Sequence, residues 1–278
     1  MLLAVDVGNS NTVLGLYQAA TEGVPVEMIA NWRVTTPSHI TVDEFGVLLR
    51  SLFASKGLEI GVVDGIAISS VVPPLDSLLL HVCELHFKVR PLFIEPGVKT
   101  GMPVLTDNPS EVGADRIVNC VAAFERFGGA AIVVDMGTAT TFDVVSKKGE
   151  FLGGAIAPGL GISADALFNR AARLPRIDVK KPAKVIGTGT VDNIQIGLYY
   201  GYIGLVDGIL ERMIAEMGPE TKTVATGGLA RLIAGGSKFL TEVDEMLTLT
   251  GLRIIYERNQ ERLGDRQRRQ RGDVEKRA

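Results

Sequence analysis

Apolar residues follow the same pattern at two places along the chain, once at its start and once near its middle. Residues 2–7 and 12–17 are short apolar runs, rich in Val and Leu and separated by a turn, which predicts a pair of strands. Residues 130–135 and 141–145 repeat that arrangement. Because strands and helices are mixed in both halves, we expect an α/β protein built by internal duplication, with a boundary near residues 126–130.

Further elements follow from the same patterns. Apolar runs that end at Pro or Gly predict strands at 27–36, 64–74, 91–96, 151–160 and 251–257. Residues 222–236 predict a strand, a glycine turn and a helix. Apolar positions at helical spacing predict helices from Asp43 to about Gly57, from a cap at Ser110 to Gly128, from a cap at Ser163 to a stop at Pro175, and over 192–217.

The longest predicted helix carries a stripe of glycines beside an apolar side. Ile194, Leu198, Leu205, Ile209 and Met213 form the apolar side, and Gly197, Gly201, Gly204 and Gly208 form the stripe. Each glycine costs a helix about 1 kcal/mol relative to alanine, so we expect the stripe to let another backbone approach closely. A membrane dimerisation motif is the rival interpretation. Acidic and amide residues within the segment favour soluble packing instead: Asp192, Gln195, Asp207 and Glu211.

Charge is unevenly distributed along the chain. The formal net charge is −3, but residues 261–278 hold seven Lys or Arg against four Asp or Glu, which leaves this tail at +3 and the rest at −6. An acidic body argues against a broad nucleic-acid surface, so no nucleic-acid partner is expected. The tail is almost free of apolar residues, which is typical of a solvated, disordered end.

Neither a targeting segment nor a membrane span is expected. The first residues lack a basic region and reach a charge at Asp6, and no apolar run approaches the ~18 residues that a span needs. Cys83 and Cys120 lack C-x-x-C spacing, which favours reduced thiols in a cytoplasmic protein. The three histidines stand apart from acidic or thiol clusters, so a zinc site is not expected.

Both repeated strand pairs turn through an Asp-x-Gly sequence that hydroxyl or amide residues follow. The glycine lets the backbone approach a ligand closely, and successive N–H groups can bind an anionic oxygen. Asp6 and Asp135 would repel phosphate, so they suit a cation that neutralises it. One such turn is a common hairpin, but its duplicate favours two turns that hold the β- and γ-phosphates of a nucleotide. The neutral donors would be Ser10, Asn11, Thr12, Thr138, Thr140 and Thr141.

Other nucleotide-binding motifs are absent from the sequence. There is no P-loop pattern G-x-x-x-x-G-K-[ST], and no G-x-G-x-x-G opens a helix after the first strand. Residues 185–191 are glycine-rich but lack both patterns, which favours a loop. The paired Asp-x-Gly turns therefore carry the nucleotide hypothesis alone.

The motifs together resemble those of the acetate and sugar kinase/Hsp70/actin superfamily. The two Asp-x-Gly turns match its phosphate-1 and phosphate-2 motifs, and "TGGLA" at 226–230 matches its adenosine motif. Within that superfamily the chain is similar to type III pantothenate kinase in four segments spaced along most of residues 1–257. These are "DVGNSNT" (6–12), "NPSEVGADR" (108–116), "DMGTATTFD" (135–143) and "GGAIAPGLGISADALFNRAARLP" (153–175).

The resemblance implies two duplicated ribonuclease-H-like halves with a cleft between them. The N-terminal actin-like domain would span 1–126 and the C-terminal one 127–257, followed by a basic tail at 258–278. It also implies ATP-dependent phosphorylation of pantothenate to 4'-phosphopantothenate, the first step of coenzyme A synthesis. The residues expected to bind the ATP phosphates are Asp6, Val7, Gly8, Asn9, Ser10, Asn11, Thr12, Val13 and Thr138.

Asp115 in "GADR" would be the catalytic base that accepts the proton of the pantothenate hydroxyl. Without the resemblance, Asp115 and Arg116 read as an exposed charged pair in the first turn of a helix. Gly113, Ala114 and Arg116 would shape the substrate site, with Arg116 suited to an anionic or carbonyl group.

The resemblance implies metal ions and a partner subunit as well. Asp135 would bind a monovalent cation, potassium or ammonium, and Asp6 would hold the divalent cation of ATP, Mg²⁺, through water. Thr190 matches a threonine that reaches pantothenate from the partner subunit, which implies a homodimer with shared active sites. The glycine stripe could serve that interface, although packing within one chain explains it equally well.

One position departs from the family. Members commonly carry a tyrosine two residues before the Asn-Pro of the "NPSEVGADR" segment, where this chain has Thr106. An aromatic wall of the substrate pocket is therefore missing or supplied elsewhere.

Two alternative functions stay open at this point: a kinase of the same fold for another small hydroxy acid, and a non-catalytic nucleotide-binding transcription accessory factor. Loss of Asp115 or of the Asp6 and Asp135 pair would favour the second, and all three are present.

Overall fold

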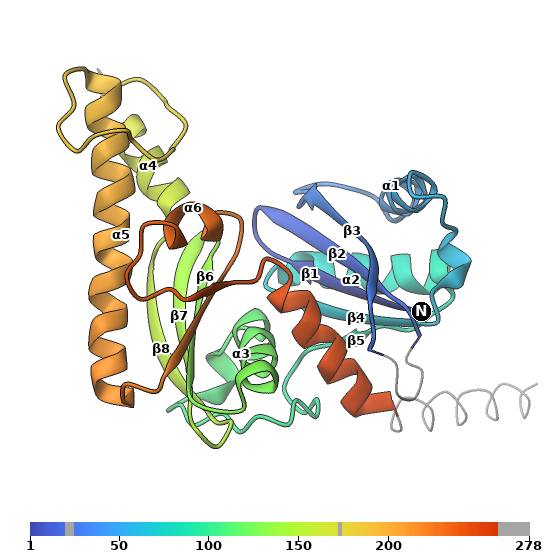
Figure 1. Ribbon diagram of the computed structural model, residues 1–278. Coiled ribbons are helices and arrows are strands. Elements are labelled where there is room, and N and C mark those ends of the chain that lie inside the picture. Colours follow the sequence, from blue (N-terminus) through green and yellow to red (C-terminus); the bar gives the residue numbers. More distant parts are fainter. Residues whose placement is uncertain (20–24, 172–173, 261–278) are drawn as a thin grey trace, which may run out of the picture. The chain divides into compact units, whose positions relative to one another are not determined.

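The structure, a computed structural model, describes residues 1–19, 25–171 and 174–260. The chain forms two compact units (Figure 1). Unit 1 contains Met1–Gly101, Ser110–Val121 and the chain from Thr248 onward, and unit 2 contains Met102–Pro109 and Ala122–Leu247. The chain thus passes between units inside helix α3 (Ala114–Phe127), shortly before the boundary expected at 126–127.

Unit 1 is built on a five-stranded mixed sheet with the strand order β3-β2-β1-β4-β5. Strand β1 pairs antiparallel with β2 and parallel with β4, so the two flanking strands run in opposite directions. The strands are β1 (Leu2–Val7), β2 (Asn11–Tyr17), β3 (Met28–Thr35), β4 (Gly65–Ser70) and β5 (Leu92–Phe93).

Unit 2 repeats this sheet with the order β10-β9-β6-β7-β8. Strand β6 pairs antiparallel with β7 and parallel with β9, as β1 does with β2 and β4. The strands are β6 (Ala131–Met136), β7 (Ala139–Val145), β8 (Phe151–Pro158), β9 (Lys222–Thr226) and β10 (Glu242–Val243). Because order and direction agree strand by strand, the predicted internal duplication and α/β class are confirmed.

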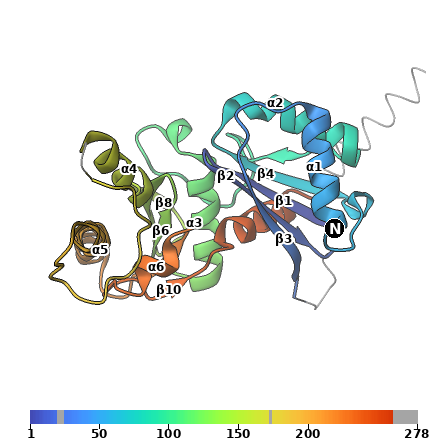
Figure 2. The ribbon, with the colours of Figure 1, turned by 90° about the horizontal axis from the view of Figure 1, so that it is seen from above.

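The two faces of the first sheet are covered by different helices. Alternate residues of β1 point to opposite faces, so Leu3, Val5 and Val7 enter a core with α1 (Val42–Ala54) and α2 (Pro73–Val82). On the other face, a β-carbon built at Gly15 would lie 2.8 Å from the Leu249 side chain, and one built at Gly65 would lie 2.1 Å from the Tyr256 hydroxyl. These two belong to a helix at residues 247–260, the C-terminal helix, which Figures 1 and 2 show on the sheet face away from α1 and α2.

The C-terminal helix corrects the strand predicted at 251–257. The β-branched pair Ile254-Ile255 favoured a strand, but burial follows a helical period through Leu252, Ile255 and Asn259, which are 0%, 0% and 4% exposed. Residues 258–260, expected to begin the tail, complete the helix; the rest of that tail, 261–278, lies outside the described residues.

Helix α2 was not predicted from the sequence. Pro73 and Pro74 were taken as the stop of a strand, but they occupy the first turn of α2, where the N–H that proline lacks has no helical partner anyway. A π-helical turn, η2 (Cys83–Phe87), continues α2, and a short 3-10 turn, η1 (Ile60–Val62), precedes β4. A second 3-10 turn, η3 (Pro109–Glu111), lies where the chain passes from unit 2 to unit 1.

Two predicted helix caps were also wrong. Ser110 lies in η3, and α3 begins only at Ala114. Ser163 lies inside α4 (Leu160–Arg170), whose cap is Gly159, and its N–H donates to the Gly159 carbonyl at 3.0 Å. Helix α4 ends at Arg170, before the stop expected at Pro175. In both cases the residue directly before the helix is a glycine, Gly113 or Gly159, and not the serine that was chosen.

Helices α5 (Thr190–Met217) and α6 (Ala230–Ala234) pack on one face of the second sheet. The most buried side chains of α5 include Tyr199, Tyr202, Val206 and Leu210. Of the predicted apolar side, Ile194 is buried and the other four residues pack partly buried against the same core, so the centre of the buried side lies about one position away from the predicted one. Within the described ranges, no helix is both long and apolar enough to cross a membrane.

Candidate active site

The first Asp-x-Gly turn joins β1 to β2. The Gly8 N–H donates to the Asn11 carbonyl at 3.0 Å, which closes the turn. Asn9, Ser10 and Asn11 are exposed, whereas Val7, just before the turn, is 1% exposed and belongs to the core. The exposed part of this turn thus offers hydroxyl, amide and backbone donors to a ligand, while the side chain of Val7 holds the strand in place.

Thr36, directly after β3, contacts this turn three times. Its N–H donates to the Ser10 carbonyl at 3.0 Å, and its hydroxyl donates to the Gly8 carbonyl at 2.6 Å. The same hydroxyl lies 3.0 Å from that of Thr12, which is only 2% exposed. Thr36 was not predicted from the sequence, because nothing local to residues 35–37 indicates a contact with residues 8–12.

Asp115 lies beside the strand ends from which the first turn projects. The Val71 N–H, just beyond β4, donates to the Val7 carbonyl at the end of β1, at 3.1 Å. A β-carbon at Gly113 would lie 3.8 Å from Val71 and 2.6 Å from Oδ1 of Asp115. The start of α3 therefore packs at the carboxyl ends of the parallel strands β1 and β4, where ligands of α/β proteins bind. Asp6, Asp115 and the turn belong to one unit.

The environment of Asp115 favours its protonated form. Burial raises the pKa of the carboxyl above its ordinary value of 3.8. The hydrogen bond from the Arg116 N–H, at 2.8 Å, and the Arg116 charge both lower the pKa, but burial has the larger effect. A carboxylate with a raised pKa is a stronger base, and proton transfer is most efficient when the pKa approaches the working pH. Such a group suits the removal of a proton from an alcohol.

The second Asp-x-Gly turn joins β6 to β7 in unit 2. The Gly137 N–H donates to the Ala139 carbonyl at 3.0 Å, and the Gly159 N–H donates to the Thr138 carbonyl at 3.1 Å. A β-carbon at Gly159 would lie 2.2 Å from the Thr138 oxygen and 2.6 Å from the Gly137 oxygen. Only glycine therefore lets the start of α4 approach this turn so closely.

Oxygen atoms converge near Asp135 in the same unit. Gly227, in the predicted adenosine motif, has a φ of +91°, and a β-carbon there would lie 2.8 Å from Oδ1 of Asp135 and 2.7 Å from the Met136 carbonyl oxygen. A carboxylate and a carbonyl oxygen are hard ligands with one negative charge between them, a donor set that fits a hard cation of low charge. In the described part of the chain, no group of three or more His, Cys, Asp or Glu residues could hold a metal ion.

Two other threonines predicted as donors near this turn have partners inside unit 2. Thr140 is 0% exposed and its hydroxyl hydrogen-bonds that of Tyr202 on α5. The Thr141 hydroxyl donates to Oδ2 of Asp143 at 2.7 Å.

The hydroxyl of Thr106, where the family commonly has tyrosine, is buried and has no hydrogen-bond partner among the described residues. The Thr106 methyl group lies 3.8 Å from the β-carbon position of Gly153.

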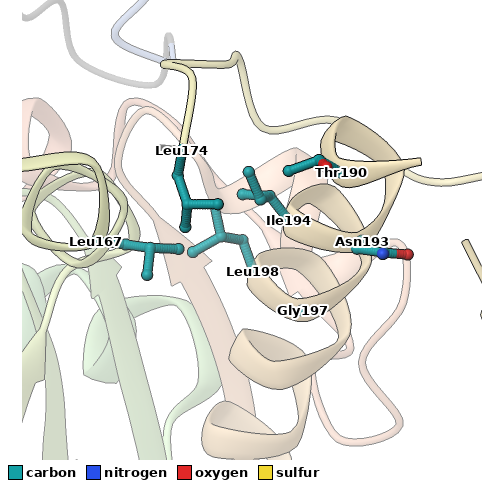
Figure 3. A pocket seen from close by; sticks show the side chains of 7 residues that line it. All are labelled: Leu167, Leu174, Thr190, Asn193, Ile194, Gly197 and Leu198. Atoms are coloured by element: carbon teal, nitrogen blue, oxygen red, sulfur yellow. The ribbon is translucent and has the colours of Figure 1, made fainter. Parts of the chain in front are cut away.

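Thr190, the first residue of α5, is exposed and lies at a cavity of about 410 Å³ between α4 and α5. Figure 3 shows four apolar side chains converging there, those of Leu167, Leu174, Ile194 and Leu198. Thr190 and Asn193 supply its polar lining, and a cavity with mostly apolar walls accepts an apolar surface more readily than a charged one.

The comparisons with known proteins decide the family. The profile of the family described as type III pantothenate kinase matches residues 2–212. The chain belongs to this family. It is 63% identical over 268 residues to a type III pantothenate kinase of Koribacter versatilis, covering 94% of this chain and 96% of that one. It is 61% identical over 257 residues to that of Acidobacterium capsulatum, covering 92% and 94%.

Solved structures agree in fold. A Campylobacter jejuni protein assigned to the Baf family of transcriptional activators superposes with a TM-score of 0.57 at 20% identity, covering 93% of this chain and 99% of that one. Component A of (R)-2-hydroxyglutaryl-CoA dehydratase from Acidaminococcus fermentans gives a TM-score of 0.52 at 12% identity, covering 92% and 96%. At such identities the likeness concerns the fold alone, and it supports the duplicated ribonuclease-H-like architecture.

The family motifs are thus divided between the two units. Asp6 to Val13, Gly113, Ala114, Asp115 and Arg116 lie in unit 1, and Asp135, Thr138 and Thr190 lie in unit 2. Within each unit the structure links segments that are far apart in sequence: Gly113 lies near Val71, whose N–H donates to the Val7 carbonyl just before the first turn, and Gly227 lies near Asp135. The cleft expected between the halves stays a prediction.

Proposed function

We propose that this chain transfers the γ-phosphoryl group of ATP to the primary hydroxyl of pantothenate and yields 4'-phosphopantothenate, the first step of coenzyme A biosynthesis. Membership of the family and high identity to proteins named type III pantothenate kinase support the reaction. The observation that carries it is the position of Asp115, whose carboxyl has a raised pKa and lies at the strand ends beside the first turn.

The first turn binds the ATP phosphates in this proposal. Its exposed residues, Asn9 to Asn11, supply neutral donors, and Asp6 holds the divalent cation of ATP, Mg²⁺, through water, which offsets phosphate charge. Thr138 in the second turn contacts a phosphate oxygen. The remaining residues of the segment, including Val7, Thr12 and Val13, set the shape of the turn.

Asp115 acts as the base. The pantothenate oxygen attacks the γ-phosphorus, the bond from that phosphorus to the bridging oxygen of ADP breaks, and the hydroxyl proton passes to the Asp115 carboxylate. Arg116 orients a carbonyl or carboxylate of the substrate, and Gly113 and Ala114 keep the wall beside it narrow. The partly buried setting that raises the pKa of Asp115 also limits the access of water that would compete for the phosphoryl group.

Asp135 binds a monovalent cation, K⁺ or NH₄⁺, in this proposal. The Asp135 carboxylate and the Met136 carbonyl oxygen lie near one another beside Gly227, and they would supply oxygen ligands to such an ion. When bound, the ion supplies positive charge near the phosphates.

We also propose a cytoplasmic homodimer in which Thr190 reaches the pantothenate site of the partner. In the described part of the chain, a β-carbon built at Gly197, Gly201 or Gly204 meets no atom within 4 Å, and one at Gly208 meets only the Arg212 side chain of the same helix, at 3.6 Å. Contacts with other described elements of the chain therefore do not account for the stripe. Large apolar side chains are exposed nearby in sequence, with Val185 63% and Ile186 82% exposed. The two cysteines, both buried and free, agree with a reducing compartment.

A coupled ADP-release assay tests the reaction. We expect ADP release that requires pantothenate and is faster in potassium than in sodium buffer. Asp115→Asn should abolish turnover while a fluorescent ATP analogue still binds. No pantothenate-dependent turnover in either buffer would overturn the proposal, and turnover with a different hydroxy acid alone would reassign the substrate.

Subunit mixing tests the shared site. Asp115→Asn and Thr190→Val chains are each expected to be inactive, but a mixed dimer contains one site with both native residues. Random mixing gives half mixed dimers, so roughly a quarter of wild-type activity should return. If both residues of a site came from one chain, mixing would restore no activity.

A further inference from the structure

The hydrogen bonds around the first turn form a directed chain. The Gly8 carbonyl can only accept, so the Thr36 hydroxyl, 2.6 Å away, donates its single proton to it. In the contact between the hydroxyls of Thr12 and Thr36, at 3.0 Å, the proton must then come from Thr12. Because the one proton of Thr12 is used in this way, its hydroxyl has none to donate to a phosphate oxygen.

The sheet geometry places Thr12 on the face away from Asp6. Thr12 is opposite Val7 in the β1–β2 register, and Asp6 is opposite Val13. Successive side chains of a strand point to opposite faces, and directly opposed residues share a face. Val7 belongs to the core beneath α1 and α2, so Thr12 points into that core, whereas Asp6 faces the other side.

The second turn is held in a corresponding way. Strand β8 leaves the sheet at Pro158, opposite Ala139, as β3 leaves at Thr35, opposite Asn11. The next residue donates its N–H to the turn in both units: Thr36 to Ser10 at 3.0 Å, and Gly159 to Thr138 at 3.1 Å. The duplication therefore preserves a contact that fixes each turn from the end of the third strand.

Thr140 corresponds to Thr12 in this comparison. Thr140 is opposite Met136, the residue after Asp135, and Thr12 is opposite Val7, the residue after Asp6. Both threonines are buried and both hydrogen-bond an element outside the hairpin, Thr36 in one case and Tyr202 in the other. The buried hydroxyl at this position serves the architecture of the turn in both halves.

We propose that Thr36 is the positioning residue of the ATP-phosphate turn, and that Thr12 acts through Thr36 rather than as a ligand of the nucleotide. The proposal rests on the assignment of this turn to ATP. With its three bonds, Thr36 holds the Gly8 and Ser10 carbonyls on the inner side of the turn, which keeps the exposed side of the turn in one conformation for the phosphates.

Steady-state kinetics of Thr36→Val test this role, with Thr35→Val as the matched control. Thr35 is the exposed neighbour at the end of β3, and no hydroxyl bond is found for it within the described residues. Losing the hydroxyl leaves the Gly8 carbonyl unpaired, so the KM for ATP should rise roughly ten-fold, with the KM for pantothenate unchanged. Thr36→Ser, which keeps the hydroxyl, should restore the KM for ATP; Thr35→Val should match wild type.

The kinetics are measured well below the melting temperature of each variant, so that activity lost through unfolding is not mistaken for a change in the KM for ATP. A lower melting temperature in Thr36→Val with an unchanged KM for ATP would overturn the proposal. A wild-type protein without pantothenate-dependent turnover would instead refute the proposed function, and binding of a fluorescent ATP analogue would then still compare Thr36→Val with Thr35→Val.

A double-mutant cycle tests the role of Thr12. If Thr12 acts through Thr36, then Thr12→Val raises the KM for ATP, and the double variant is no worse than Thr36→Val alone. If Thr12 binds the nucleotide directly, the two effects multiply. Multiplied effects would overturn that half of the proposal.

Discussion

Replacing Gly159 by alanine is the sharpest test of how the second turn is held. The new β-carbon would lie 2.2 Å from the Thr138 carbonyl oxygen, against a shortest normal approach of 3.0 Å, so one backbone must move by about 0.8 Å. Neither side of this clash can move easily, because the Gly159 N–H already donates a hydrogen bond to the same Thr138 oxygen at 3.1 Å. The displacement therefore reaches Thr138 itself.

Two costs follow from this displacement. Overpacking costs about 1–3 kcal/mol and the strained hydrogen bond about 1 kcal/mol, so unfolding free energy should fall by roughly 2–4 kcal/mol. A misplacement of nearly 1 Å at a reacting site can cost about a hundred-fold in rate. We therefore expect kcat/KM for ATP to fall by about two orders of magnitude, more than the loss of stability explains at 25 °C.

Gly161→Ala is the matched control. Gly161 lies two positions further along, inside α4, and a β-carbon there meets no atom of the described residues within 4 Å. Alanine should stabilise the helix by up to about 1 kcal/mol and leave the kinetics unchanged. Urea unfolding and the coupled assay measure both quantities. If Gly159→Ala and Gly161→Ala had the same kcat/KM, the close approach of α4 would not position the turn.

Two further predictions concern the charged residues of the site. Because burial raises the pKa of Asp115 in the folded state, its contribution to stability is fully present below its ordinary value of 3.8 and is lost as the pH rises through the raised value. At pH 7.5 the free energy of unfolding of Asp115→Asn, measured by urea titration, should therefore exceed that of wild type by about 1.4 kcal/mol for each pH unit between the raised and the ordinary pKa. The difference should vanish near pH 4. Equal stability of the two proteins at pH 7.5 would contradict the reasoning. Gly227→Ala would place a methyl group within 2.8 Å of Asp135 and at a φ of +91°, so rate enhancement by potassium over sodium should be lost. Gly235→Ala should retain it, because no atom of the described part of the chain lies nearer than 3.5 Å to a β-carbon there. Full potassium dependence in Gly227→Ala would refute the assignment of the cation to Asp135.

Much of the fold was predictable from the sequence, because each half of the chain repeats an alternation that specifies a strand pair and its turn. The strands at the start of both halves and the long helix α5 are confirmed. The failures came where a short window was ambiguous. Ile254-Ile255 suit a strand in isolation, and only the packing of the C-terminal helix on the first sheet and against α3 shows the helical period. The contact with α3 is close, since a β-carbon at Gly251 would lie 2.1 Å from the Val118 carbonyl oxygen.

The candidate site divides in the same way. The sequence by itself determined the Asp-x-Gly turns and the segment with Asp115, because a tight turn and its donors are local in the chain. Only the tertiary structure decided what holds them: Thr36 under the first turn, Gly159 and Tyr202 at the second, Gly227 beside Asp135. These contacts join strand ends to helices and turns that are tens of residues apart, and such tertiary pairing leaves no mark in the sequence around either partner.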